Sequence, residues 1–193
     1  MSTKTRVAIL FGSESDRTTM QETAKVLDSF GIGYEMEQAS AHRSPDKVRD
    51  IVRGAPERGV EVFVAAAGMA NHLAGAVAAH TSLPVIGVPL GGSPLGGADA
   101  LLSTVQMPAG VPVATVAVGK SGAENAAILA AQILAVGDAR LAARLEEYKQ
   151  TLARGVAEKD ARLQKERRAV HRSAEPHETR GGVREGRTAR GDA

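Results

Sequence analysis

Short apolar runs alternate with segments of helical periodicity along the first 135 residues of the chain. Four runs are rich in β-branched residues, as buried parallel strands are, and a more polar run at 34–38 is a fifth candidate. The four runs are 6–11, 60–66, 85–88 and 113–118. Between them, apolar residues recur at steps of three and four, over 20–30, 48–55, 73–79, 98–105 and 126–135. The alternation predicts an α/β fold, a three-layer sandwich with a parallel five-stranded sheet.

A sixth helix is expected after this alternation ends. Asp138, which follows a glycine, is a candidate N-cap. An apolar stripe then recurs at helical steps on an otherwise polar segment, at Leu141, Leu145, Tyr148, Leu152 and Val156. The stripe needs a partner surface, which is either the rest of this domain or a neighbouring subunit.

The composition changes near residue 160. Large apolar residues become rare, and 160–193 hold nine Lys or Arg residues against six Asp or Glu residues. Such a segment buries too little apolar surface to offset the entropy of ordering, so we expect 172–193 to be disordered. We therefore expect an α/β domain at 1–158, which includes the C-terminal helix, and a basic, mostly disordered tail at 159–193.

Composition also excludes several classes of protein and site. The 193 residues include no cysteine, and no acidic pair or histidine cluster has the spacing of a metal site. Aromatic residues make up 3% of the chain and the excess positive charge belongs to the tail, which argues against a nucleic-acid partner. No apolar run reaches the roughly 18 residues of a membrane span, and the N-terminus does not resemble a signal peptide. We expect a cytoplasmic protein with neither a membrane nor a nucleic-acid partner.

Ligands of parallel sheets bind where the strands end, and polar loops follow the first two predicted strands. The first loop contains Ser13 and Asp16, and it forms either an anion site at a helix start or an N-cap cluster without a ligand. The second contains His42 and Arg43. The guanidinium group of arginine can donate two hydrogen bonds to one phosphate, and histidine ordinarily titrates near neutral pH. This pair therefore suits phosphate binding and proton transfer. The alternative is a pair of exposed side chains without a role.

Two glycine-rich segments follow later strands. The segment 67–75 contains His72, which either faces the same strand ends as the first two loops or packs on the sheet. The segment 87–97 has the composition of a mobile lid. Neither 119–121 nor 31–33 has the spacing of a P-loop or a dinucleotide fingerprint. The residues alone therefore predict an α/β enzyme that binds a small phosphorylated ligand and uses a histidine for proton transfer.

Several motifs occur in one order over about residues 6–148. They are GSESD at 12–16, SAHRSPDK at 40–47, HLAG at 72–75, LPVIGVP at 83–89, LLSTVQMPAGVPVAT at 101–115 and GKSGAENAAILAAQIL at 119–134. Together they resemble the class I phosphoribosylaminoimidazole carboxylase catalytic subunits, which are also described as N5-carboxyaminoimidazole ribonucleotide mutases of the PurE type.

The resemblance implies a flavodoxin-like sandwich that assembles as a homo-octamer, with the substrate held between subunits. It implies conversion of N5-carboxyaminoimidazole ribonucleotide to 4-carboxyaminoimidazole ribonucleotide in de novo purine biosynthesis, on the route to IMP. No metal or organic cofactor is implied. By motif position, His42 is the proton-transfer residue. The positions expected at or near the substrate are Ser13, Asp16, Arg43, Ser40, His72 and the Gln106-Met107-Pro108 stretch.

The third loop departs from a common form of the family. It reads GMANHLAG at 68–75, where that form reads GGAAHLPG, and the retained His72-Leu73 pair favours class I. Two alternatives remain open: an aminoimidazole ribonucleotide carboxylase that uses free CO2, and a flavodoxin-like binding module without catalysis.

Overall fold

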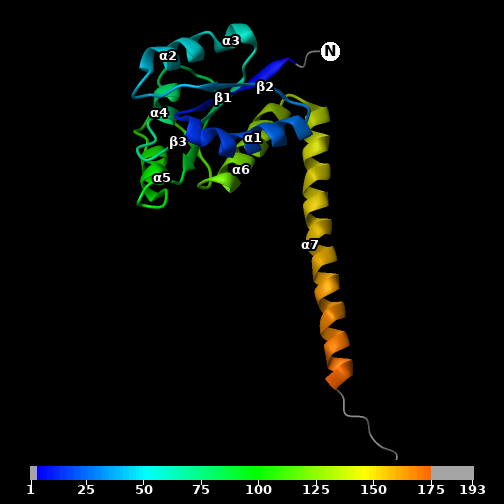
Figure 1. Cartoon of the computed structure of the whole chain (residues 1–193). Coiled ribbons are helices and arrows are strands. Elements are labelled where there is room, and N and C mark those ends of the chain that lie inside the picture. Colours follow the sequence, from blue (N-terminus) through cyan, green and yellow to red (C-terminus); the bar gives the residue numbers. More distant parts are fainter. Residues whose placement is uncertain (1–3, 175–193) are drawn as a thin grey trace, which may run out of the picture. The chain divides into compact units, whose positions relative to one another are not determined.

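The structure of the chain, a computed structural model, describes residues 4–174 (Figure 1). The chain divides between Tyr148 and Lys149 into two units, and the first unit contains the whole sheet. The described part of the second unit is helical throughout.

Five parallel strands form one sheet in the order β2-β1-β3-β4-β5. β1 lies between β2 and β3, so the chain reverses its direction across the sheet at β1. This is the flavodoxin-like order, in which ligands bind at the carboxyl ends of the strands near the reversal. The strands are β1 (Thr5–Phe11), β2 (Gly33–Gln38), β3 (Val62–Gly68), β4 (Val85–Leu90) and β5 (Ala114–Thr115).

Helices cover both faces of the sheet, as Figure 1 shows, and the residues of β1 alternate between the two layers. Val7 and Ile9 pack into the cluster formed with α1 and α6, whereas Ala8 and Leu10 pack into the cluster on the other face. The helices are α1 (Arg17–Ser29), α2 (Pro45–Arg53), α3 (Ala55–Arg58), α4 (Leu73–Ala78), α5 (Ala98–Val105), α6 (Lys120–Ala135) and α7 (Ala139–Ala174). The predicted three-layer α/β sandwich with five parallel strands is confirmed.

The last strand is shorter than the run at 113–118 predicts. β5 contains only Ala114–Thr115, which pair with Ile86 and Gly87. The next bond of a parallel ladder would need a backbone N–H from Pro89, and proline has none. Regular pairing therefore ends there.

Ser121 and Glu124 have the spacing of a capping box, but no capping box forms at the start of α6. α6 begins at Lys120, with Gly119 as its N-cap, so Ser121 already lies inside the helix and no side-chain cap bond is made. The side chain of Glu124 lies 3.8 Å from Nζ of Lys120 instead. Gly119 has φ +74°, and this turn starts the helix earlier than the sequence pattern indicates.

Helix α7 begins as predicted and extends further than expected. Oδ1 of Asp138 accepts a hydrogen bond from the Leu141 backbone N–H (3.1 Å), which confirms the N-cap. The helix continues to Ala174 because 159–174 contain no glycine or proline and are rich in residues of high helix propensity. The boundary predicted between 158 and 159 therefore falls inside a helix, and 175–193 of the predicted tail lie outside the described residues. Within the described part, no helix is both long and apolar enough to cross a membrane.

Candidate active site

Loops at the carboxyl ends of β1, β2, β3 and β4 surround a cavity of about 940 Å3. It lies at the reversal of strand order, where sheets of this topology bind ligands, and its volume is typical of small-molecule sites. The structure brings together all six residues predicted to form the site, because each of them lines this cavity: Ser13, Asp16, Ser40, His42, Arg43 and His72.

The loop after β1 directs polar side chains to the cavity rather than capping α1. Its residues Glu14–Asp16 form a single 3-10 turn, and Asp16, at the N-cap of α1, makes no side-chain cap bond. Oγ of Ser15 lies 3.1 Å from Oγ of Ser13 and 3.4 Å from Oδ1 of Asp16. The interpretation as a plain N-cap cluster therefore does not describe this loop.

The half-buried carboxyl group of Asp16 experiences opposing influences on its pKa. Burial has the largest effect and raises the pKa above the ordinary value of 3.8. The backbone N–H of Ser13, the hydroxyl of Ser15 and the charge of Arg43 act in the opposite direction. A ligand hydroxyl that donates to Asp16 would restore hydrogen bonding that burial removes.

The loop after β2 is held closed by hydrogen bonds between its serines. Ser44 is the N-cap of α2 and Pro45 its first residue, but Ser44 makes no side-chain cap bond. Oγ of Ser44 accepts from the Ser40 N–H (2.9 Å), and Oγ of Ser40 accepts from the Arg43 N–H (3.2 Å). The closed turn leaves the side chains of His42 and Arg43 exposed at the cavity.

Arg43 connects the second loop to the first. Its Nη2 donates to the carbonyl oxygen of Gly12 at 2.8 Å. This bond fixes one edge of the guanidinium, which has five N–H donors and so retains others for a phosphate or carboxylate. The geometry suits the anion-binding role predicted for Arg43.

The loop after β3 has a strained residue at the cavity and a buried amide behind it. Met69 has φ +56°, in the left-handed region that favours glycine, and its exposed side chain lines the cavity. The backbone N–H of Asn71 donates to Oγ of Ser103 (2.8 Å), and its Nδ2 donates to the carbonyl oxygen of Val88 (3.3 Å). These bonds connect the loop to α5 and β4 and fix the backbone next to His72.

His42 and His72 come from the loops after β2 and β3, the two strands that flank β1. Nε2 of His42 lies 2.7 Å from Nδ1 of His72, and the rings meet edge-on, with centroids 4.8 Å apart and planes at 78°. One of these nitrogens donates and the other accepts, so a single proton lies between the rings. Each imidazole thereby orients the other, and the pair is placed to accept or deliver a proton in the cavity.

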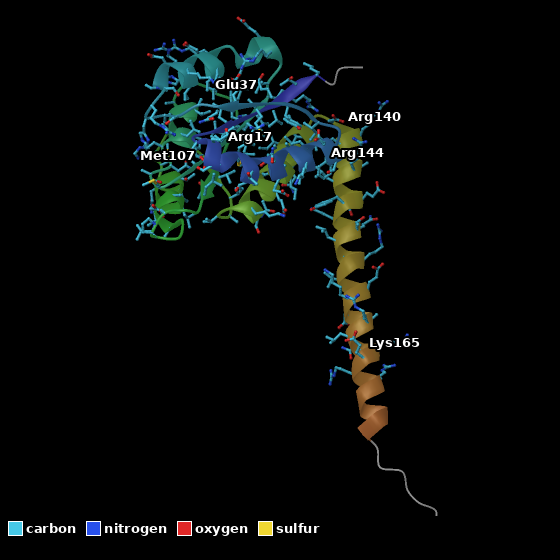
Figure 2. All side chains as sticks on the ribbon, viewed as in Figure 1. Arg17, Glu37, Met107, Arg140, Arg144 and Lys165 are labelled. Carbon is cyan, nitrogen blue, oxygen red and sulfur yellow. The ribbon has the colours of Figure 1, made fainter. Side chains whose placement is uncertain are left out.

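The sequence does not indicate every feature of the cavity. Asn71 anchors the loop through contacts with distant segments, which no local motif indicates. Met69 stands where the common family form has a glycine, and that difference was the available signal of a left-handed residue. The Gln106-Met107-Pro108 stretch is not among the cavity-lining residues of the described chain. Met107, labelled in Figure 2, has its Cε 3.2 Å from the position that a β-carbon on Gly75 would take.

The loop after β4 contributes Gly91 and Gly92 to the cavity, and its predicted mobility as a lid stays a prediction. The described residues contain no group of three or more His, Cys, Asp or Glu side chains that could hold a metal ion. The polar side chains that line the described cavity carry imidazole, guanidinium, carboxylate and hydroxyl groups.

Comparisons with known proteins show similarity over nearly the whole first unit. A family model described as AIR carboxylase matches residues 6–155. The N5-carboxyaminoimidazole ribonucleotide mutase of Thermotoga maritima is 51% identical over 82% of this chain and 92% of the relative. The protein of the same name from Bacillus subtilis is 48% identical over 81% of this chain and 97% of the relative.

A solved structure agrees with these sequence matches. The crystal structure of Treponema denticola PurE superposes with a TM-score of 0.74 and 31% identity, over 81% of this chain and 97% of that chain. The residues matched by the family model include every residue that lines the cavity. The chain therefore belongs to the AIR carboxylase family.

Proposed function

We propose that this protein is an N5-carboxyaminoimidazole ribonucleotide mutase, which forms 4-carboxyaminoimidazole ribonucleotide in de novo purine biosynthesis in the cytoplasm. The contact between His42 and His72, inside a cavity whose other polar groups suit a ribotide, carries the proposal. Membership of the family and the name shared by its relatives support the same reaction.

The ribotide binds through the two loops that Arg43 connects. The N–H groups of Arg43 that are not bonded to Gly12 receive the phosphate, together with the hydroxyl of Ser13. The carboxylate of Asp16 accepts hydrogen bonds from ribose hydroxyls, and Ser40 completes the wall beside the base. This arrangement directs the aminoimidazole ring toward the two histidines.

The reaction moves a carboxylate between two atoms of one molecule. Cleavage of the carbamate releases CO2 and leaves an electron pair on the exocyclic nitrogen, which takes up a proton. C4 then attacks the CO2, and the new carbon–carbon bond leaves C4 with both a proton and a carboxylate. Loss of the C4 proton restores the aromatic ring. One proton is taken up and one is released, so a single acid–base group serves both steps.

His42 is that acid–base group, and His72 orients its ring and shares its proton. General acid–base catalysis by a positioned side chain typically contributes about 10²–10⁴-fold to the rate. The distance of 2.7 Å between the two rings has a consequence for the protonation state. If both facing nitrogens carried protons, two donors would oppose each other, so the working pair holds at most one proton at this contact.

The freed CO2 must stay beside C4, and water must stay out. His42 and His72 are both exposed in the single chain, so a further element has to cover them during turnover. The glycine-rich loop at 91–97 is one such element. A neighbouring subunit is the other, and this need supports the homo-octamer with the substrate between subunits.

The direct test is an assay on synthetic N5-carboxyaminoimidazole ribonucleotide in degassed, bicarbonate-free buffer. The mutase forms product at once under these conditions. A carboxylase that uses free CO2 would act instead on aminoimidazole ribonucleotide supplied with bicarbonate. A binding module would bind the ribotide and give no product in either mixture.

A further inference from the structure

A second cavity, of about 470 Å3, lies at the opposite edge of the sheet from the candidate active site. Its wall includes Lys4 and Arg6 at the start of β1, the turn at 30–33 before β2, and Arg140 and Arg144 at the start of α7. β1 has seven residues, so roughly 20 Å of strand separates the two cavities. A ligand in one cavity therefore does not reach the other. We call this second site the basic cavity.

The basic cavity has four cationic side chains in its wall and one carboxylate, Asp138. The positive charge of Arg6 is already paired with carboxylates, because its Nε donates to Oε1 of Glu61 (2.7 Å) and its Nη1 donates to Oδ2 of Asp138 (3.1 Å). The other oxygen of Asp138 caps α7. The two nearby carboxylates, Glu61 and Asp138, are thus occupied by Arg6 and the helix cap. The positive charges of Lys4, Arg140 and Arg144 outnumber these two negative charges.

Arg144 is held in place by the backbone. Its Nη1 donates to the carbonyl oxygen of Phe30 at 2.6 Å. A β-carbon on Gly31 would lie 2.8 Å from this Nη1, and Gly31 has φ +63°, so a glycine here provides both the turn and the space for the guanidinium. The bond uses one N–H and leaves the other donors of a pre-oriented fork available to a ligand.

Arg140 lies one helical turn before Arg144, and Figure 2 labels both at the start of α7. Side chains four residues apart on a helix are neighbours, so two guanidinium groups can bind one anion. The side chain of Arg140 is exposed, and within residues 4–174 no hydrogen bond or ion pair engages it. Phe30 and Leu141, both buried, provide an apolar floor below these charges.

We propose that the basic cavity is a second ligand site, which binds a small organic phosphate monoester. The phosphate is held by Arg140 and Arg144, and the organic part lies over Phe30 and Leu141. The volume is typical of a small-molecule site and exceeds the need of a bare phosphate ion. This site is independent of the proposed catalytic function, because none of its residues lines the catalytic cavity.

The test is calorimetric titration of the full-length protein with adenosine 5′-monophosphate, ribose 5-phosphate and inorganic phosphate. The titrations compare the wild type with Arg140→Ala, Arg43→Ala and a surface control, Arg49→Ala. We expect at least one organic phosphate to bind more tightly than inorganic phosphate, and Arg140→Ala to weaken that binding about tenfold, as loss of a charged hydrogen bond does. We expect Arg49→Ala to leave this binding unchanged. We also expect Arg43→Ala to leave binding in the basic cavity unchanged.

Three outcomes would overturn the proposal. Binding that is lost in Arg43→Ala and unchanged in Arg140→Ala would place the phosphate in the catalytic cavity alone. Equal affinity for inorganic and organic phosphates would refute the assignment to an organic ligand. No detectable binding at millimolar ligand would show that the basic cavity is not a site for any of these phosphates. Because Arg140 has no side-chain partner in the described chain, its loss leaves folding intact, and a melting curve of each variant verifies this.

Discussion

The Nε2 atom of His42 lies 2.7 Å from the Nδ1 atom of His72, although 29 residues separate them in the chain. The contact depends on two loops of different construction. Hydrogen bonds between Ser40 and Ser44 close the first loop, and Asn71 anchors the second to its neighbours. The distance between these two atoms therefore depends on the geometry of both loops.

Replacing His42 by asparagine keeps a polar side chain and removes the imidazole that transfers the proton. We expect turnover to fall by at least about 10²-fold, because the proton on C4 then has no acceptor. Ribotide affinity stays within tenfold, since Arg43 and Asp16 are unchanged. Steady-state rates and a calorimetric titration measure the two quantities. His80→Asn, outside the cavity lining, is the matched control and keeps full activity, whereas near-normal turnover of His42→Asn would refute the assigned role.

Substitution of Arg43 tests its proposed role in binding the ribotide. Arg43→Lys keeps the charge and loses the fork that reaches both Gly12 and a phosphate. Hydrogen bonds to charged groups contribute about 1.5–3 kcal/mol, so we expect KM to rise about tenfold or more while kcat changes less. Arg49→Lys, on the exposed side of α2 between Asp46 and Asp50, should leave both constants unchanged. A selective loss of kcat in Arg43→Lys would contradict a binding role.

The raised pKa of Asp16 makes the stability of the folded protein depend on pH. Burial raises the pKa of this carboxyl group in the folded state, so the folded protein binds its proton more tightly than the unfolded chain does. The contribution of the group to stability therefore falls as pH rises from the ordinary value of 3.8 through the raised folded-state value. Asp16→Asn should melt at a slightly higher temperature than the wild type at pH 7, and the difference should shrink toward pH 4.

Melting curves of Asp16→Asn and wild type across pH 4–7 measure this difference, and Asp46→Asn, on an exposed helix position, is the control. The same variant should bind the ribotide more weakly, because an amide is a poorer acceptor for ribose hydroxyls. A melting temperature that is lower than that of the wild type at pH 7 would show that Asp16 stabilises the fold as a carboxylate, against this account.

Gly122, in the first turn of α6, packs closely against the segment that precedes the helix. A β-carbon there would overlap the carbonyl oxygen of Ala117, so Gly122→Ala must displace either α6 or the segment before it. Overpacking of this kind costs about 1–3 kcal/mol, which corresponds to a drop of several degrees in melting temperature. Gly155→Ala is the matched control, because nothing lies within 4 Å of its β-carbon. An unchanged melting temperature for Gly122→Ala would contradict the close approach.

The sequence was sufficient to predict the parallel sheet and to predict that the six candidate residues lie around one cavity. Alternation of β-branched runs and helical stripes depends on burial, which the residue types reveal directly, and α5 falls at the predicted residues Ala98–Val105. The six candidate residues meet because the carboxyl ends of parallel strands share one edge. Neither inference needs knowledge of loop conformation.

What the sequence could not provide depends on contacts between distant segments. Pairing of β5 ends where Pro89, on another strand, has no N–H to donate. The anchoring role of Asn71 depends on its amide reaching Val88, which nothing local in the sequence shows. The distance between His42 and His72 likewise depends on the left-handed residue Met69 and on the closed turn at Ser40, neither of which follows from spacing.

In the proposed reaction, one carboxylate moves within one ribotide. N5-carboxyaminoimidazole ribonucleotide that carries ¹³C in its carboxylate is converted in the presence of excess unlabelled bicarbonate, and the product is analysed by mass spectrometry after a single turnover. We predict that the product keeps the label, because the CO2 stays in the cavity beside C4 until C4 attacks it. Product that contains mainly unlabelled carboxylate would contradict the account.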